Sequence, residues 1–475
     1  MFTSYFVYLY LFILSFLPIS SWTHGLIGQP ESFIPNEVQT DSEKIVSNLV
    51  FRKLVNVNPF TGEIKYDLLK NYTVSDDGLT YVIELKQNQY WQDGFPIMAD
   101  DVLYTASLSP NLREVSSDKV DDYKVRFSLP NKYSPFLSVL AIGILPSHLQ
   151  DQNSKLISVG SGDYRIVRVT KDRTRIEEVV LVTRSGKYPY KKLNFRFYEN
   201  EDYIRVAAKI KEIGSMLFNK KEDISGFNAK KYVFYGRSYL LVFDTKKDYL
   251  DKDTRKSIVN MINYDEIIKN QEYQDAECPF GPFSSTWAQS DSYERPMGNS
   301  GDTLDIKKDL VLVIPNVNEA RLIAQNIKKQ IESSSDHDVE IKALSSKDYI
   351  VKIRDTKYDM VLLAQEYGLD PDRFVFWHST QNSTGLNFSN SSAIRIDKSL
   401  EEGRETVELE DRKVHYNIFQ SVFSEETPAV FILHPSQYLY YSNSINNIPE
   451  QKYFYPWSIL DNFDKWEKVE PTILL

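Results

Sequence analysis

The chain has 475 residues, of which 42% are hydrophobic and 26% charged, and its formal net charge is −10 at pH 7. This length allows two or three domains with a large core, and the composition is that of an ordinary globular protein. The acidic balance argues against nucleic acid as a partner, since phosphate binding needs concentrated lysine and arginine. The single cysteine, Cys278, excludes a disulfide within the chain and a cysteine-based zinc site.

The first predicted element is an apolar segment from Phe2 to Trp22, which contains no Asp, Glu, Lys or Arg. About 20 apolar residues are enough for a secretory signal or for a membrane-spanning helix. The basic residues that usually open a signal are missing, because the first lysine is Lys44. We expect residues 1–23 to form an export signal, either cleaved or kept as a membrane anchor, with the rest of the chain outside the cytoplasm.

A β-strand and a turn motif come next. Leu79–Leu85 is rich in β-type residues and follows an Asp77-Gly78 turn. Trp91 to Tyr104 reads Trp-Gln-Asp-Gly-Phe-Pro-Ile-Met-Ala-Asp-Asp-Val-Leu-Tyr, in which the Asp-Gly pair predicts a tight turn. We expect Asp100 to cap a short helix and Asp101 to lie in its first turn. An acid–base pair is the rival interpretation, but no histidine stands nearby.

The second half of the chain predicts a parallel sheet. Leu310–Ile314, Asn318–Glu332 and Val339–Leu344 form a strand–helix–strand unit, and such a crossover implies parallel strands. Asn318 is a candidate cap for the helix. No glycine fingerprint follows the first strand, so a dinucleotide site is disfavoured.

Catalytic and metal motifs are missing from the sequence. The six histidines are scattered, none forms His-Glu-x-x-His, and there is no Gly-x-Ser-x-Gly element. The sequence does not exclude a catalytic carboxylate pair of the glycosidase kind. The prior for such a pair is low, because 66 acidic residues make close pairs inevitable. We therefore expect no catalytic residue, no metal and no cofactor.

The order of strand, Asp-Gly turn, tryptophan, tight turn, proline and helix resembles the family 5 extracytoplasmic solute-binding proteins, which are oligopeptide- and dipeptide-binding receptors of ABC importers. Their Trp-x-Asp-Gly-x-Pro-x-x-Ala-x-Asp-Val signature matches Trp91–Val102. Further family-like elements follow in the same order over almost the whole chain: Val159–Tyr164, Arg237–Thr245, Asp253–Lys256, Ile262–Ile268, Asp370–Asp372 and Pro428–His434.

The resemblance implies an α/β fold with two lobes, of the periplasmic-binding-protein-like class II, cluster C type, and an extra inserted β-rich subdomain. Lobe I would be discontinuous and would take residues 24–45, 155–240 and 435–475. The inserted subdomain would take residues 46–154. Lobe II would take residues 241–434.

The resemblance also suggests which residues line the ligand cleft, where aromatic surface and a few polar groups are expected. In peptide-binding members an acidic residue just before the Asp-Pro pair holds the ligand's α-ammonium group. That position is Tyr367 here, and the nearest acid is Glu366. For every candidate, packing in the core is an equally weighted alternative. The candidates are Gln29, Tyr104, Tyr239, Glu366, Tyr367 and Trp377.

The function implied is that of the substrate-binding component of an ABC importer for peptides, which closes two lobes over its ligand and delivers it to permease subunits. We expect a monomer that meets the membrane through its N-terminal segment. Members of the family also bind other solutes, so the ligand is left open. The alternative is a membrane-anchored ligand sensor or a chaperone-like binding protein on the same fold, without a transport role.

Overall fold

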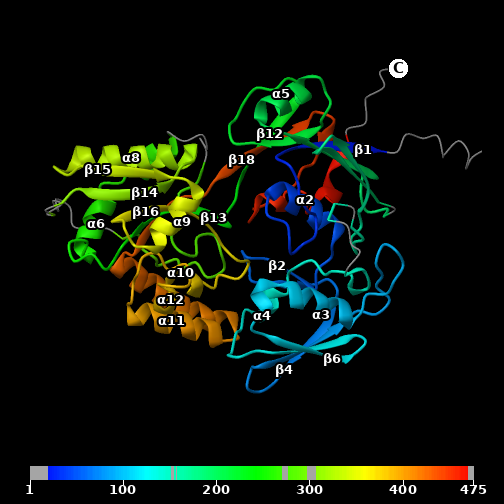
Figure 1. The fold of residues 1–475 in the computed structure, drawn as a ribbon, viewed down its shortest axis with the longest axis horizontal. Helices are drawn as coiled ribbons and strands as arrows, with labels where there is room; N and C mark the ends of the chain where they lie inside the picture. The colour runs from blue at the N-terminus through cyan, green and yellow to red at the C-terminus, as the bar shows by residue number, and fades with distance from the viewer. Residues whose placement is uncertain are drawn as a thin grey trace, which may run out of the picture.

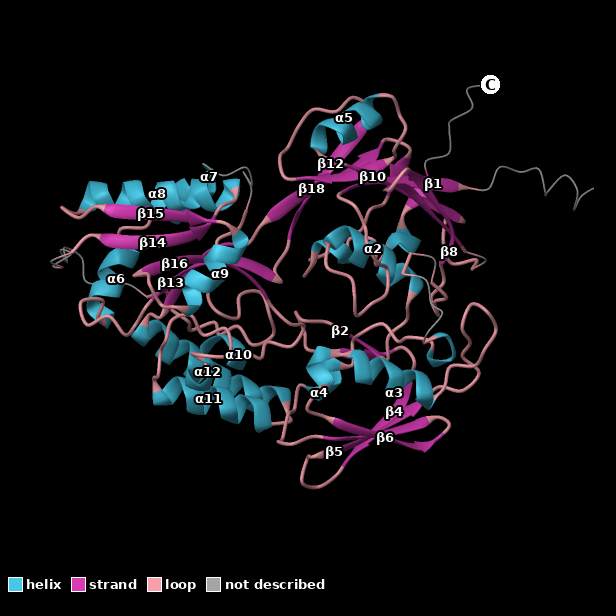
Figure 2. Cartoon of the chain, in the orientation of Figure 1, coloured by secondary structure: helices cyan, strands magenta, loops and turns pink. Residues whose placement is uncertain are grey.

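The computed structural model describes residues 20–150, 155–156, 158–183, 185–269, 276–296, 306 and 308–468. Three sheets organise them, and Figures 1 and 2 show the two larger sheets side by side with the third below. Short 3₁₀ turns lie at Pro110–Leu112, Ser147–Leu149, Ser379–Gln381, Pro456–Ser458 and Phe463–Lys465.

Lobe I is built on a seven-stranded sheet in the order β12-β18-β11-β1-β10-β9-β8. β1 is central and pairs in parallel with β10 and β11. Helix α5 (Glu201–Lys209) packs on this sheet, and α2 (Asp41–Val50) lies on its other side (Figure 1). The strands are β1 Ser21–Ile27, β8 Arg165–Asp172, β9 Arg175–Val182, β10 Lys192–Tyr198, β11 Ser215–Phe218, β12 Phe227–Val233 and β18 Ser436–Ser442.

The last residues of the predicted export segment form part of this sheet. Its residues 1–19 lie outside the described residues, but Ser21, Trp22 and Thr23 belong to β1. Trp22 is buried, and its indole Nε1 donates a hydrogen bond of 2.9 Å to the Ser215 hydroxyl. The lobe I sheet therefore includes three residues that we had assigned to the export segment. In the part of the chain that the structure describes, no helix combines the length and apolarity needed to cross a membrane.

Lobe II is built on a five-stranded sheet in the order β15-β14-β16-β13-β17. The predicted strand–helix–strand unit is confirmed, because β14 and β15 pair in parallel and α8 joins them. Asn318 does not cap α8, since Val317 holds that position and no side chain caps the helix there. The strands are β13 Arg237–Phe243, β14 Leu310–Pro315, β15 Val339–Leu344, β16 Met360–Glu366 and β17 Ala429–Leu433. The helices are α6 Lys252–Asn260, α7 Tyr264–Lys269, α8 Asn318–Ser334, α9 Ser346–Arg354, α10 Phe374–Trp377, α11 Ile394–Glu405 and α12 Leu409–Glu426.

The inserted subdomain carries the third sheet, with four antiparallel strands in the order β4-β5-β7-β6. It lies below lobe I in Figure 2, beside helices α11 and α12 of lobe II. Its elements are β2 Val55–Val57, β3 Ile64–Tyr66, β4 Leu69–Val74, β5 Thr80–Leu85, β6 Ser116–Asp121, β7 Lys124–Ser128, α3 Ala99–Leu108 and α4 Phe136–Val139. Near the C-terminus β19 (Ile445–Asn446) pairs with β20 (Glu467–Lys468).

Asp101, not Asp100, caps α3. The helix begins at Ala99, so Asp101 is its third residue, and its Oδ2 accepts hydrogen bonds from Met98 N at 2.8 Å and from the Trp91 indole at 3.1 Å. Its Oδ1 accepts two more, both of 2.8 Å, from the backbone and the hydroxyl of Ser147. Asp100 instead points outward and pairs with Lys119. The expectation for Asp100 was wrong because the helix starts two residues earlier than a cap at Asp100 requires, with Met98 at the cap position.

The chain passes between the two large sheets twice in its described part. The first passage runs from Val233 at the end of β12 to Arg237 at the start of β13, and the second from Leu433 to Ser436. The two passages lie together, because Phe234 N donates a hydrogen bond of 3.0 Å to Pro435 O. The chain thus enters the lobe II sheet at residue 237, whereas we had expected lobe I to extend to residue 240. The predicted domain boundaries otherwise stay a prediction.

Two buried histidines make the fold sensitive to acid. Burial lowers the pKa of His24 and of His434 to about 4, from 6.5 in an unfolded chain. Between these values the unfolded chain binds more protons than the folded one, so stability falls as the pH falls from 6.5 towards 4. We expect each histidine to remove about 2–3 kcal/mol from the free energy of unfolding at pH 4.5 relative to pH 7.

Urea unfolding at pH 7 and pH 4.5 measures this loss. His434 Nδ1 donates to Arg237 O at 2.6 Å, and asparagine can keep a donor there without titrating. His434→Asn should therefore shrink the difference in stability between the two pH values. An unchanged difference in this variant would contradict the assignment.

Candidate ligand cleft

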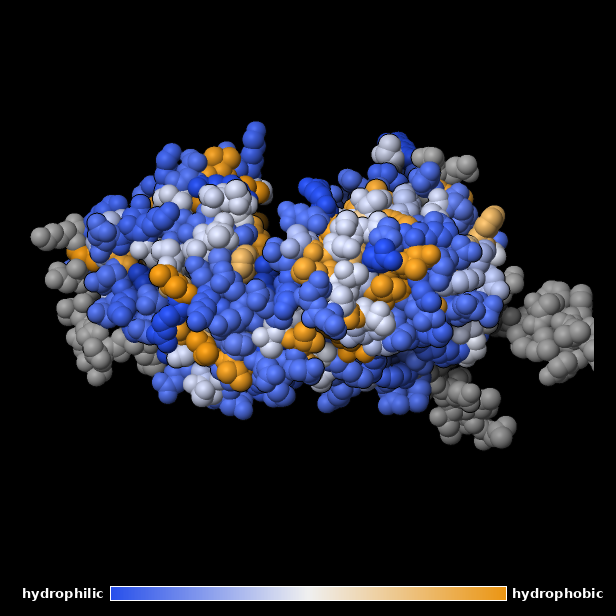
Figure 3. Space-filling model, turned by 90° about the horizontal axis from the view of Figure 1, so that it is seen from below, coloured by the Kyte–Doolittle hydropathy of each residue, from blue (hydrophilic) through white to orange (hydrophobic). Residues whose placement is uncertain are grey.

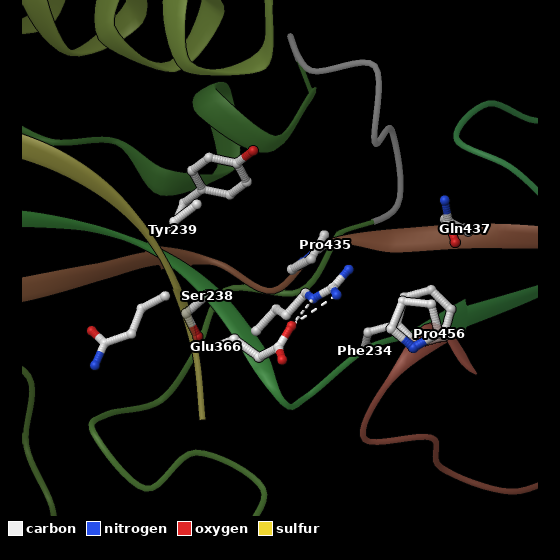
Figure 4. Close-up of a pocket in the computed structure, with 10 residues that line it drawn as sticks. Phe234, Ser238, Tyr239, Glu366, Pro435, Gln437 and Pro456 are labelled. Atoms are coloured by element: carbon white, nitrogen blue, oxygen red, sulfur yellow. Dashed lines mark hydrogen bonds and ion pairs between the residues drawn. The ribbon is translucent and has the colours of Figure 1, made fainter. Parts of the chain in front are cut away.

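A cavity of about 300 Å³ lies where the two chain passages meet the sheets of both lobes. Figure 3 shows a groove between the two halves of the molecule, and Figure 4 shows the cavity with its lining. Lobe II contributes the first residues of β13 and the last residues of β16, and lobe I contributes residues around β18. The lining residues are Phe234, Arg237, Ser238, Tyr239, Ala364, Gln365, Glu366, Pro435, Gln437 and Pro456.

Arg237 is the centre of a charge cluster that joins the two lobes. Its guanidinium donates to both carboxylate oxygens of Asp41, at 2.6 and 2.8 Å, and to Glu366 Oε2 at 2.8 and 3.0 Å (Figure 4 shows the pairing with Glu366). Lys44 Nζ lies 3.4 Å from the other oxygen of Glu366. Asp41 and Lys44 come from α2 in lobe I, whereas Arg237 and Glu366 come from the lobe II sheet. The ion pairs therefore cross from one lobe to the other.

An aromatic ring supports the two cations of this cluster. The Trp457 ring lies 3.8 Å from Lys44 Nζ and 5.3 Å from the Arg237 guanidinium carbon, at distances typical of cation–π contacts. Burial alone would lower the pKa of Arg237, but hydrogen bonds and charge from Asp41 and Glu366 raise it above its ordinary value. The arginine is thus permanently charged. The four charges sum to zero, so both carboxylates of the cluster are already neutralised.

The structure brings two of the predicted site residues together. Tyr239 and Glu366 both line the cavity. Gln29 lies elsewhere, exchanging hydrogen bonds with the backbone of Ile176 at the edge of a different, open cavity. Tyr104 is on α3 in the inserted subdomain, where its hydroxyl donates to Gln150 O at 3.3 Å.

The other two predicted site residues lie in the core of lobe II. Tyr367 is 4% exposed, and its ring lies 4.2 Å from the Arg373 guanidinium carbon. Trp377 is 3% exposed and packs edge-on against Phe423 at 4.8 Å between ring centres. Neither lines the cavity at the crossings. Contact of any of these residues with a ligand stays a prediction.

Sequence reasoning missed the residues that dominate the electrostatics of this cavity. Asp41 was hidden because an acidic residue in the first turn of a helix is expected for helix capping alone. Arg237 gave a weak signal, since it is the one charged residue that opens an otherwise apolar and buried strand. No group of three or more His, Cys, Asp or Glu in the described residues is arranged to hold a metal ion.

Two α/β lobes joined by two chain passages, with a cavity at the passages, define a class of extracytoplasmic solute-binding proteins. The family model for bacterial extracellular solute-binding proteins, family 5, matches residues 63–387. The chain belongs to this family, which confirms the resemblance and the two-lobed fold inferred from the sequence.

Similar proteins cover almost the whole chain. The oligopeptide-binding protein AppA of Bacillus subtilis is 21% identical over an alignment of 524 positions, which covers 93% of this chain and 90% of AppA. The ABC transporter substrate-binding protein CtaP of Listeria monocytogenes has a similar structure, with a TM-score of 0.79, 22% identity and coverage of 95% and 99%. NikZ of Campylobacter jejuni, solved in complex with Ni(L-His), gives a TM-score of 0.73, 21% identity and coverage of 95% and 100%.

Proposed function

We propose that this protein captures peptides between its two lobes outside the cytoplasm and delivers them to the permease of an ABC importer. The observation that carries the proposal is the cavity at the two chain passages, whose lining comes from both lobes. The names of AppA, an oligopeptide-binding protein, and CtaP, an ABC transporter substrate-binding protein, support it over a sensor or chaperone without a transport role. Permease contact and an N-terminal anchor are part of the proposal.

Closure of the lobes is the proposed mechanism. Two short segments, 234–236 and 434–435, link the large sheets, so a small rotation of the backbone there moves one lobe against the other. A ligand that contacts both lobes binds the closed form more tightly than the open form and shifts the population towards closure. The crossing ion pairs of Arg237 and Lys44 help the closed form in the same way.

The lining favours recognition of peptide groups rather than of a free terminus. Glu366, the acid nearest the position expected to hold an α-ammonium group, is already paired with Arg237 and Lys44. Ser238, Gln365 and Gln437 add neutral donors and acceptors, and within the described residues the amide nitrogen of Gln365 has no hydrogen-bond partner. A ligand ammonium would have to displace an existing cation, whereas a backbone amide needs only such neutral groups.

Matched peptides test this function. Tetrapeptides of one sequence, with a free or an acetylated amino terminus, are titrated against the full chain by calorimetry and thermal unfolding. We expect both forms to raise the melting temperature and to bind within about threefold of each other, which is less than 1 kcal/mol. Ligand at 100 times its Kd should add about 2.7 kcal/mol of stability.

The outcomes separate the two parts of the proposal. A peptide library that produces no thermal shift would contradict peptide capture. A free amino terminus preferred by more than tenfold would keep peptide capture but contradict neutral recognition at Glu366. Arg237→Met, which removes the guanidinium from Asp41 and leaves Glu366 with Lys44 alone, should shift the preference towards the peptide with a free amino terminus. Lys70→Met, on the far surface of β4, serves as the control.

A further inference from the structure

A second cavity, of about 830 Å³, lies between lobe I and the inserted subdomain. Its walls are the C-terminal end of α2, the segment around β2 and β3, the loop at 161–163 and the segment 460–462. It shares no lining residue with the cleft cavity, and no residue of lobe II lines it. The cavity is therefore separate from the proposed peptide site.

Several charged groups in this cavity are satisfied by neighbours. Arg52 donates to Asp67 at 2.6 Å and to Gln89 at 2.7 Å. Asp163 accepts a hydrogen bond of 3.0 Å from the Tyr188 hydroxyl. Two further cations on the lining are also ion-paired, Lys65 with Glu63 at 3.7 Å and Lys187 with Asp464 at 3.8 Å.

Lys53 and Asp461 differ from these groups. In the described chain, the ammonium group of Lys53 makes no hydrogen bond and no ion pair, although the charges of Asp461 and Asp67 act on it. Among the residues that the structure describes, Asp461 forms no ion pair either, and it accepts a hydrogen bond from Ser458. One positive and one negative residue thus line the same cavity without forming an ion pair with each other.

The surrounding protein makes both charges costly. Burial lowers the pKa of Lys53, and burial raises the pKa of Asp461 to about 6. Asp461 is at the same time exposed to solvent, so its carboxylate lies where the cavity is open. An unpaired charge in such surroundings is stabilised by a counter-charge that fills the space between.

We propose that this cavity binds a small zwitterion, a solute with one carboxylate and one ammonium group such as a free amino acid. The carboxylate of the solute would face Lys53, and its ammonium would face Asp461. A zwitterion supplies a counter-charge to Lys53 and to Asp461 and leaves the net charge of the cavity unchanged. A simple anion or a simple amine compensates one charge and leaves the other unpaired. Three asparagines on the walls, Asn48, Asn56 and Asn462, supply neutral hydrogen bonds to the rest of the solute.

The proposed zwitterion site is separate from the proposed peptide site in the cleft. Helix α2 links the two regions, since Asp41 and Lys44 in its first half reach the cleft and Asn48 and Leu49 near its end reach the second cavity. Ten residues of helix span about 15 Å. A solute in one site is thus too far from the other to share its contacts.

Three probes of equal chain length test the inference on the full chain: 5-aminopentanoate, pentanoate and pentylamine. Saturation-transfer NMR and calorimetry at pH 7.5 should show binding of 5-aminopentanoate and at least tenfold weaker binding of the two singly charged probes. Lowering the pH to 5 protonates Asp461 and should weaken 5-aminopentanoate about tenfold. Two shorter zwitterions, glycine and 4-aminobutyrate, are tested alongside these probes. Equal binding of all three probes, or no binding of any of the three zwitterions at millimolar concentration, would overturn the inference.

Variants assign the binding to this cavity. Lys53→Met and Asp461→Asn should each abolish the preference for the zwitterion, and Lys70→Met should leave it unchanged. The charge swap, Lys53→Asp with Asp461→Lys, should restore binding with the solute reversed. Asp461→Asn is the conservative change at a solvent-accessible position, so it keeps the test valid if Lys53→Met fails to fold. Zwitterion binding that survives Asp461→Asn would place it elsewhere and overturn the inference.

Discussion

Replacing Asp370 with alanine should destabilise the folded chain by about 3–5 kcal/mol. Asp370 accepts two hydrogen bonds from the Arg412 guanidinium, at 2.8 and 2.9 Å, and the Arg412 side chain is only 3% exposed. The variant leaves a buried guanidinium with neutral partners alone, namely Gly403 O and the Tyr416 hydroxyl. Losing one half of a buried ion pair costs far more than the pair contributes, because the remaining charge stays desolvated.

Urea unfolding followed by tryptophan fluorescence measures this cost. Asp355→Ala is the matched control, because Asp355 forms an ion pair with Lys357 in which both side chains are largely exposed. Such a surface pair contributes little, so the control should unfold at nearly the wild-type urea concentration. Similar losses in the two variants would contradict the role of burial.

Replacing Asp101 with alanine should cost about 3 kcal/mol. Its carboxylate accepts four hydrogen bonds that tie the start of α3 to Trp91 and to Ser147, and Asp101 is 2% exposed. Without it, the Trp91 indole and the Ser147 backbone amide lose their acceptor inside the subdomain. Hydrogen bonds to a charged acceptor contribute more than neutral ones, and buried donors left unpaired add the cost of desolvation.

Asp100→Ala is the matched control for this experiment, since it removes the neighbouring carboxylate, whose side chain is 52% exposed. It should change the urea midpoint little. Equal shifts of the urea midpoint in the two variants would contradict the assignment of the cap to Asp101.

Local patterns predicted the elements well where the period of apolar residues is clear. The strand expected at Leu79–Leu85 is β5, and the strand–helix–strand unit from Leu310 to Leu344 is confirmed with parallel pairing. Cap residues were harder, because one residue of shift in the helix start changes which side chain reaches the free backbone amides. The cap expected at Asp100 was displaced by two residues, to Met98, and the cap expected at Asn318 by one, to Val317.

The candidate site could be predicted only in part. Tyr239 and Glu366 lie on neighbouring strands and both line the cavity, but Arg237, which pairs with Glu366, also pairs with Asp41, 196 residues away in the sequence. Such long-range pairing follows from the packing of the lobes and leaves no local signal. Trp377 shows the opposite case, because an aromatic residue in a short apolar run suits a cleft wall and a core equally, and only the packing against Phe423 places it in the core.

Small-angle X-ray scattering of the full chain, with and without a bound peptide, tests most directly whether two rigid halves shut over a guest molecule. We expect saturating peptide to lower the radius of gyration of the protein, and we expect the peptide to be recovered chemically unchanged. A scattering curve that peptide leaves unaltered at full occupancy, or recovery of a cleaved peptide, would contradict this expectation.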